Sequence, residues 1–266
     1  MDKATDRTGT IRVAINGTEL AVRVSGTGAP LMLLHGWPHT GRIWDGVRPA
    51  RRRRIVPDLR GLGDSAPADD GFDAATAAAD LIGLLDFLEV ETVEVAAIDA
   101  SVPTAFLLAM RHPERVTRLV LMEGTVPGLA GGFDPPPWWF GFHAVPKLPE
   151  TLIEGREDDY LGWFLRRVDD PELRTALVDA YRGRRRLGAG FGFYRALDRT
   201  AELVRAALAG GRLHVPTVAL GGNVVGERLH RQLEPITDNL RGEILERCGH
   251  IVPLDRPDAL TDLLAG

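Results

Sequence analysis

The sequence has a single cysteine and no long apolar run among its 266 residues. The lone Cys248 excludes an internal disulfide, and its place beside Gly249 and His250 favours a small apolar filler over a reactive thiol. No apolar stretch approaches the ~20 residues that a helix needs to cross a bilayer. The opening MDKATDRTGT lacks the charged and then apolar regions of a secretory signal. We therefore expect a cytoplasmic protein that does not enter a membrane.

A surplus of basic residues is also missing, because the formal net charge is -5. Binding to nucleic acid or to an anionic membrane needs Lys and Arg gathered on one face. The one basic run, Arg51 to Arg54, directly precedes IVPDLRG, so we interpret it as a solvated approach to a strand rather than an anion site. Hydrophobic residues make up 44% of the chain, well above the level of disordered proteins, so the chain can bury a large core.

The hydrophobic pattern changes after the opening segment. TIRVAI and ELAVRVSG alternate apolar and polar residues around Asn16 and Gly17, which predicts an antiparallel hairpin. Later runs are apolar without alternation, as in strands buried on both faces: PLMLLHG, RRRIVPDL, TVEVAAID, RVTRLVLME, HVPTVALGG and GEILERCGH. Helical patterns such as AATAAADLIGLLDFLE and VPTAFLLAMRHPE separate many of them. We therefore expect an α/β fold with a mainly parallel, doubly wound sheet.

This alternation stops between residues 131 and 211. The stretch opens with DPPPWWFGFHAVPKLP and continues in amphipathic helices such as EGREDDYLGWFLRRV, before HVPTVALGG resumes the sheet. We therefore expect a core made of residues 1–130 and 212–266. Residues 131–211 are predicted to form an inserted helical cap over the carboxyl edge of the sheet.

One strand-to-helix junction carries a reactive side chain. Ala97, Ile98, Asp99, Ala100 and Ser101 follow the pattern small, any, nucleophile, any, small, with Ala and Ser in place of the usual glycines. Small residues are needed because the turn is sharp and brings the helix close to the strand. Taken alone, the pattern fits an Asp that caps the following helix equally well. The neighbouring motifs have to separate these two interpretations.

Two further motifs accompany the junction in a specific order. HGWP, at His35–Pro38, follows the third predicted strand, and DLRGLGDS, at Asp58–Ser65, follows the fourth. With them the sequence resembles the α/β hydrolases over nearly its whole length, and within these the epoxide hydrolases and dehalogenases that use an Asp nucleophile. The resemblance implies that Asp99 is the nucleophile and that the N–H groups of Trp37 and Ala100 form the oxyanion hole.

The other residues of these motifs have less direct roles. We expect His35 and Pro38 to lie at the substrate site, although bracing of the loop is favoured over a chemical role for the His35 ring. Asp58 and Arg60 are expected to hold the geometry of their loop.

A catalytic triad also needs a base and an acid that orients it. His250 follows the last predicted strand in RCGHIVPLDRP, where the resembled family carries its histidine. Glu123 ends the RLVLME strand, whereas Asn223 occupies the alternative position for the acid beyond the cap. MEGTVPG is also similar to a segment of a bacterial epoxide-hydrolase subgroup that uses Glu here. The predicted triad is therefore Asp99, His250 and Glu123.

The resembled epoxide hydrolases open the ring with two hydrogen-bond donors from the cap. Tyr194, in AGFGFYRAL, aligns with one donor, with a buried structural Tyr as the alternative. The second donor position falls in WWFGFH, where this chain has Trp138 and Trp139 in place of the common Trp-His pair. An indole N–H donates a hydrogen bond but does not act as an acid, so Tyr194 is the predicted acid. Both tryptophans are predicted substrate contacts, with hydrophobic packing as the alternative.

Together these residues predict an epoxide hydrolase that forms an alkyl ester on Asp99, which water activated by His250 then hydrolyses. Ala100 replaces a large Trp that relatives often carry, and the indoles are flat. Both features favour a bulky aromatic or polycyclic epoxide of secondary metabolism. The resemblance implies no cofactor and no metal, with the small-molecule epoxide as the binding partner. The oligomeric state stays open, with a homodimer as one option.

Two other functions stay open. Haloalkane or haloacid dehalogenases share the nucleophile and base, but this chain has Trp37, Ala100 and Pro103 where those enzymes carry halide-binding or carboxylate-binding side chains. A catalytically silent ligand-binding protein is the alternative of a different class, because a fold does not fix a function.

Overall fold

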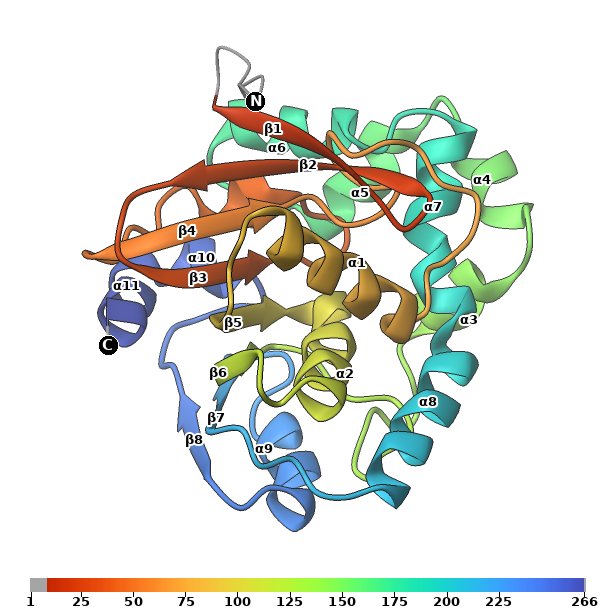
Figure 1. The fold of residues 1–266 in the computed structure, drawn as a ribbon. Coiled ribbons are helices and arrows are strands. Elements are labelled where there is room, and N and C mark those ends of the chain that lie inside the picture. Colours follow the sequence, from red (N-terminus) through yellow and green to blue (C-terminus); the bar gives the residue numbers. More distant parts are fainter. Residues whose placement is uncertain (1–8, 266) are drawn as a thin grey trace.

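A computed structural model describes residues 9–265, which contain an eight-stranded sheet with helices on both faces (Figure 1). The strands are β1 (Thr10–Ile15), β2 (Thr18–Ser25), β3 (Ala29–Leu34), β4 (Arg52–Pro57), β5 (Val93–Ile98), β6 (Val116–Met122), β7 (Thr217–Gly221) and β8 (Leu240–Ile244). Their order in the sheet is β1-β2-β4-β3-β5-β6-β7-β8. The pairs from β4 to β8 are parallel, and the antiparallel pairs are β1 with β2 and β2 with β4. The predicted doubly wound α/β fold is confirmed.

The hairpin of β1 and β2 turns at the two residues that the sequence indicated. Asn16 and Gly17 have φ angles of 47° and 74°, and the ladder closes on the pair Ile15 and Thr18. Two consecutive residues with positive φ match the right-handed twist of the flanking strands, which explains the preference for Asn-Gly at such a turn.

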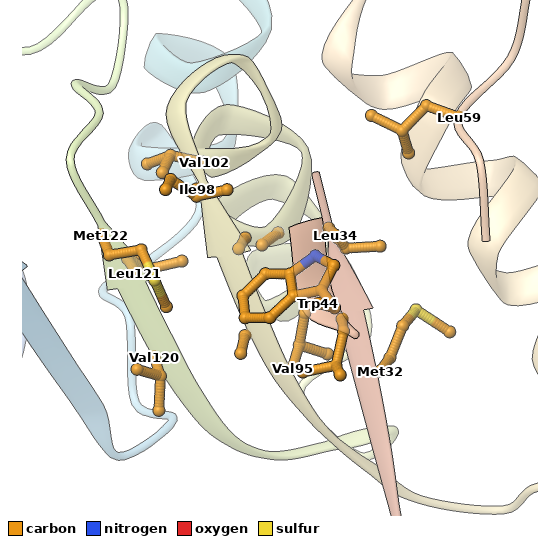
Figure 2. Packing of buried hydrophobic residues seen from close by; sticks show 14 of the residues in the cluster. Met32, Leu34, Trp44, Leu59, Val95, Ile98, Val102, Val120, Leu121 and Met122 are labelled. Atoms are coloured by element: carbon orange, nitrogen blue, oxygen red, sulfur yellow. The ribbon is translucent and has the colours of Figure 1, made fainter. Parts of the chain in front are cut away.

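The central strands are apolar on both faces because helices cover both. All residues of β5 and β7 are buried. Helices α1 (Ala74–Phe87) and α2 (Val102–Arg111) lie in front of the sheet in Figure 1. The Asp73 carboxylate caps α1 by accepting from the N–H groups of Ala75 and Thr76. Figure 2 shows part of the core, with the Trp44 indole beside the strands that carry Met32 and Val95.

The core contains further helices and short 3-10 turns outside the sheet. They are α9 (Arg228–Leu233), α10 (Val252–Asp255) and α11 (Pro257–Ala265), with the 3-10 turns η1 (Gly41–Trp44), η2 (Asp99–Ser101) and η3 (Glu234–Ile236). Within residues 9–265 the longest helix is α1, with 14 residues, and no helix there has the length and apolar character needed to cross a bilayer.

Two expected segments differ from the structure. The last strand ends at Ile244, so the predicted strand over residues 242–250 is too long, because the chain has to leave the sheet to bring His250 to the neighbouring strand ends. The basic run is not a solvated approach. Arg52 lies inside β4 and forms an ion pair with the buried Glu94, and Arg54 donates to the Trp44 carbonyl.

Between β6 and β7 the described chain is helical. It forms α3 (Trp138–Ala144), α4 (Leu148–Ile153), α5 (Glu157–Phe164), α6 (Pro171–Asp179), α7 (Arg184–Arg195) and α8 (Leu197–Ala209). We call residues 131–211 the helical insertion. In Figure 1 α3, α4, α7 and α8, drawn in green to cyan, lie along the side to which β3 and β5 point. Tyr181 donates to the His39 carbonyl at 2.8 Å and Arg186 donates to the Ser65 carbonyl at 2.7 Å, so the insertion packs on the loops at that edge.

Candidate active site

Asp99 lies at the sharp junction between β5 and α2. Its φ of 57° is in the left-handed region, which non-glycine residues seldom adopt and which is frequent at functional sites. Ser101 stabilises the turn, because its hydroxyl accepts from the Ile98 N–H at 3.1 Å and lies 2.9 Å from the Ile98 carbonyl. The Asp99 carboxylate does not cap α2 but accepts hydrogen bonds from Trp37 and His250. The helix-capping interpretation is therefore excluded.

The close packing around Asp99 requires glycine in the neighbouring loops. A Cβ on Gly36 would lie 2.4 Å from Asp99 Oδ1, and a Cβ on Gly124 would lie 2.7 Å from the Asp99 carbonyl oxygen. Atoms at such distances clash. The sequence therefore keeps glycine where the adjacent strands' loops approach the junction, while the junction itself tolerates Ala97 and Ser101.

Two carboxylates and one imidazole meet at the carboxyl edge of the sheet. The Trp37 N–H donates to Asp99 Oδ1 at 2.8 Å. His250 Nε2 lies 3.1 Å from Asp99 Oδ2, and His250 Nδ1 lies 3.2 Å from Glu123 Oε2. Because β3, β5 and β6 are parallel neighbours, their carboxyl ends meet at one edge, and the loop after β8 returns His250 to it. The three side chains form a continuous hydrogen-bonded array.

Glu123 is fully buried at the end of β6, with a φ of 43°. Its carboxylate accepts from the backbone N–H groups of Gly222 and Val225 in the loop after β7. Asn223 lies in the same loop, but its side chain is exposed and its N–H donates to the Cys248 carbonyl. The loop after β7 thus does not supply the acid. It supplies the N–H donors that orient the Glu123 carboxylate.

The array holds a proton on His250. Burial lowers the pKa of His250, but the hydrogen bonds and charges of Asp99 and Glu123 outweigh burial and raise that pKa to about 10. Burial raises the pKa of Asp99, but the hydrogen bond and charge of His250 outweigh it and lower that pKa below its ordinary value. At neutral pH the resting site therefore contains an imidazolium between carboxylates. An imidazolium does not accept a proton, so His250 acts as a base only after a partner has lost its charge.

These groups face a cavity of about 710 Å³ between the strand ends and the helical insertion. Asp99, His250 and Glu123 line it together with Trp37, Pro38 and Ala100. The opposite wall is mainly aromatic and includes Trp139, Phe140, Trp163, Phe164, Phe193 and Tyr194. A cavity of this size and apolar character is typical of a small-molecule site.

Tyr194, on α7, is the tyrosine of the insertion that lines the cavity. Its side chain is only 9% exposed, and its ring packs against the rings of Trp37 and Phe140 at 5.5 and 5.2 Å. Burial, followed by the charge of Asp99, raises the pKa of Tyr194 well above its ordinary value, while hydrogen bonding by the Trp139 side chain acts in the opposite direction. Tyr194 therefore keeps its proton at neutral pH and can donate it.

Trp138 and His35 are not among the residues that line the cavity, contrary to expectation. Trp138 is 57% exposed and packs edge-on against Trp139 and Trp163 on the outer side. Adjacent helical residues point about 100° apart, so α3 turns Trp139 and Phe140 towards the cavity and Trp138 away from it. His35 is fully buried, with Nδ1 at 2.9 Å from the Gly36 carbonyl and Nε2 accepting from the Leu59 N–H at 3.1 Å. Its contacts are those of a loop brace.

Asp58 also holds the geometry of these loops, as expected. Its carboxylate accepts from the Gly41 N–H at 2.7 Å and from the Asp64 N–H at 2.8 Å. Cys248 is buried, and burial raises the pKa of its thiol to about 12, so it carries no thiolate at neutral pH. Over residues 9–265 there is no group of three His, Cys, Asp or Glu side chains placed to hold a metal ion.

His39, which follows HGWP directly, was not predicted from the sequence. Its side chain is only 1% exposed and lines the cavity beside Asp99 and His250. The available signal was its position in the loop that carries the Trp37 N–H. His143, in contrast, is fully buried within the insertion, where its Nε2 pairs with the Tyr160 hydroxyl at 2.6 Å, and it does not line the cavity.

Comparison with known proteins gives consistent results. The model of the alpha/beta hydrolase family matches residues 31–263. The chain is 30% identical to the soluble epoxide hydrolase of Corynebacterium sp. (strain C12), over 93% of each protein. Its structure is similar to that of Cfl2 from Burkholderia cenocepacia, with a TM-score of 0.88 and 30% identity over 96% of this chain and 94% of the other. The epoxide hydrolase CorEH gives a TM-score of 0.87 and 29% identity over 96% of each chain.

Proposed function

The chain belongs to the alpha/beta hydrolase family, and we propose that it is an epoxide hydrolase that works through an ester on Asp99. One observation carries the proposal. A carboxylate stands where this fold places its nucleophile, bonded to His250 and to the Trp37 N–H, and it faces a cavity that Tyr194 also lines. The similarity to the Corynebacterium epoxide hydrolase over 93% of both chains supports the same reaction.

The first half of the reaction opens the ring. Asp99 is ionised at neutral pH and attacks an sp3 carbon without help from a base. A bond forms between the carboxylate oxygen and that carbon, and the ring C–O bond breaks with its electron pair moving to the epoxide oxygen. Tyr194 gives its proton to this oxygen. Over the cycle Tyr194 is reprotonated by the proton that His250 holds at rest, so His250 becomes neutral.

Formation of the ester also prepares the base. The hydrogen bond and charge of Asp99 are among the causes that raise the pKa of His250, and a neutral ester supplies neither. The pKa of His250 therefore falls once Asp99 is alkylated, while Glu123 keeps the ring oriented at Nδ1. The same histidine is a proton donor to Tyr194 in the first half of the reaction and a base towards water in the second.

The second half hydrolyses the ester. His250 takes a proton from water, the resulting hydroxide adds to the ester carbonyl of Asp99, and the oxyanion forms at Oδ1. Trp37 N–H already donates to this oxygen at 2.8 Å, and we assign Ala100 N–H as the second donor. Collapse breaks the bond to the alkyl oxygen and releases the second oxygen of the vicinal diol as an alkoxide, which takes up the proton left on the new Asp99 carboxyl group. Asp99 is again a carboxylate, and His250 keeps the proton that it took from water as its resting proton.

We further propose that the helical insertion is the cap of this enzyme and that its substrate is bulky and aromatic. The cavity of about 710 Å³ exceeds what a small aliphatic epoxide needs, and aromatic rings of the insertion form its wall. Ala100 leaves the space beside the nucleophile open. The dehalogenase alternative has less support, because Trp37 and Ala100 stand where those enzymes carry halide-binding side chains. Ala100 has no hydrogen-bond donor in its side chain, and the Trp37 indole nitrogen lies against Gly190 of α7.

Glu123→Gln should slow turnover of an aryl epoxide by roughly 100- to 10,000-fold, because the neutral amide removes the charge that orients and stabilises the His250 imidazolium. Asn223→Ala is the matched control and should change turnover little, since the side chain is exposed and only the backbone N–H of this residue is bonded. Steady-state rates of both purified variants check the expectation. Equal losses would show that the acid has been assigned to the wrong strand.

The function itself is tested by incubating the protein with styrene oxide and measuring the diol by chromatography. Wild type should produce the diol, and Tyr194→Phe should lower the rate of ring opening by roughly 100-fold or more through loss of the acid. Trp139→Phe should have a smaller effect, about 5- to 30-fold, the size of one hydrogen bond of about 1–2 kcal/mol. No diol from any aryl epoxide, with chloride released from a haloalkane instead, would replace the proposal by the dehalogenase alternative.

A further inference from the structure

A second histidine, His39, lies at the array without a role in the reaction as derived above. It follows Pro38 in the loop after β3 and lines the cavity together with Asp99 and His250. Its Nδ1 atom is buried and unpartnered within the described part of the chain, so no water reaches it there. The Nε2 atom is not buried in this way and forms no hydrogen bond with another described residue, so it is the nitrogen that is open to the cavity. A polar atom at the wall of such a cavity binds an ordered water.

The position of the ring suits a water shared with the base. The centroids of the His39 and His250 rings are 6.2 Å apart, with the planes inclined by 43°. The structure gives no hydrogen bond between the two rings, but two hydrogen bonds of about 2.9 Å through one water span up to about 5.8 Å between nitrogens. The water that attacks the ester must lie beside both His250 and the Asp99 carboxylate. A water bridging the two imidazoles lies in that region.

The backbone of His39 is fixed on both sides. Its N–H donates to the Gly36 carbonyl at 3.1 Å, and its carbonyl accepts from the buried Tyr181 hydroxyl at 2.8 Å. The same short loop carries the Trp37 N–H that contacts Asp99. The His39 ring is thereby held at a constant place relative to the ester carbonyl, which is what positioning of a nucleophilic water requires.

We propose that His39 is a positioning residue that holds the hydrolytic water against His250 and Asp99; this inference rests on the proposed ester mechanism. Burial lowers the pKa of His39 to about 3, so the ring is neutral and does not compete with His250 for the proton. A neutral imidazole offers one donor and one acceptor on opposite sides of the ring, and the nitrogen that is open to the cavity can hold one water in either tautomer. The water keeps a lone pair for the ester and a proton for His250.

The test separates the two halves of the reaction in single turnovers of styrene oxide, with the ester and the diol followed by rapid quench and intact-protein mass spectrometry. His39→Phe keeps the ring but removes both nitrogens. It should slow ester hydrolysis by about 5- to 150-fold, the range expected for one lost buried hydrogen bond, and leave ester formation close to wild type. His39→Gln retains a polar atom near the Nε2 position and should recover part of the hydrolysis rate.

Tyr181→Phe is the control for loop position, since it removes the bond to the His39 backbone and leaves the imidazole in place. If His39 served only the loop, His39→Phe and Tyr181→Phe would slow both steps alike and His39→Gln would give no recovery, which would overturn the inference. Unchanged hydrolysis in His39→Phe would overturn it as well. Failure of the ester mechanism is recognised separately, because wild type itself would then show no adduct on Asp99.

Discussion

Asp99→Asn is expected to lower diol formation by at least about 10,000-fold, because a neutral amide is a poor nucleophile although it keeps an oxygen for the Trp37 N–H. The variant retains the shape of the side chain, so the junction after β5 should fold as in wild type. Asp99→Ala should be equally inactive and guards against slow conversion of Asn back to Asp. Rates with styrene oxide and circular dichroism of both variants check these expectations.

Isotope labelling shows whether the carboxylate itself attacks the substrate. In a single turnover of wild type in 18O-water, the diol should contain no solvent oxygen and the label should appear in the peptide that carries Asp99. The reason is that Asp99 supplies the oxygen to the product and replaces it from water in the hydrolysis step. A first diol that carries the solvent label would mean that water opens the ring directly and that Asp99 is not the nucleophile.

His250→Ala should trap the intermediate that Asp99→Asn prevents. Ester formation needs the ionised Asp99 and Tyr194, whereas hydrolysis needs the base. Hydrolysis should therefore slow by roughly 100- to 10,000-fold, much more than ester formation, which loses only the charge of His250 beside Asp99. Intact-protein mass spectrometry should then show the enzyme plus one substrate mass, and digestion should place the added mass on the Asp99 peptide. His250→Gln tests the same step with more of the side chain's volume retained.

His112→Ala is the matched control for the loss of a histidine. This residue ends α2, its side chain is partly exposed, and Glu114 is its ion-pair partner at 3.6 Å. It should leave both half-reactions unchanged. A His250→Ala enzyme that forms no adduct while Asp99 remains intact would contradict the assignment of ester formation to Asp99 and of ester hydrolysis to His250.

The fold could be predicted because strand and helix periods differ and because local signals agreed with them. Asn16 and Gly17 marked the hairpin, and unbroken apolar runs marked strands covered on both faces. The cluster of Asp99, Glu123 and His250 was also predictable, since carboxyl ends of neighbouring parallel strands meet at one edge. The order of the motifs along the chain and their positions at strand ends were sufficient to predict this cluster without knowledge of side-chain geometry.

What escaped prediction depends on rotations and turns that sequence patterns do not encode. Trp138 and Trp139 are adjacent, and the short helix α3 has too few turns to reveal which residue faces inward. His35 and His39 belong to the same loop, and the path of that loop turns one into the core and the other to the cavity. The basic run could not be assigned either, because Arg52 is held inside β4 by Glu94, a residue of a different strand.

The imidazolium between Asp99 and Glu123 also affects the folding equilibrium. An ordinary histidine has a pKa of 6.5, whereas the folded protein raises that of His250 to about 10. The folded state binds this proton more tightly than the unfolded chain does, so the resulting stabilisation is complete below pH 6.5 and disappears as pH rises through about 10. Esterification of Asp99 removes one of the two carboxylates that bind the His250 imidazolium, at any pH. Each alkylated molecule therefore holds the loops after β5, β6 and β8 together less strongly, until hydrolysis restores the charge.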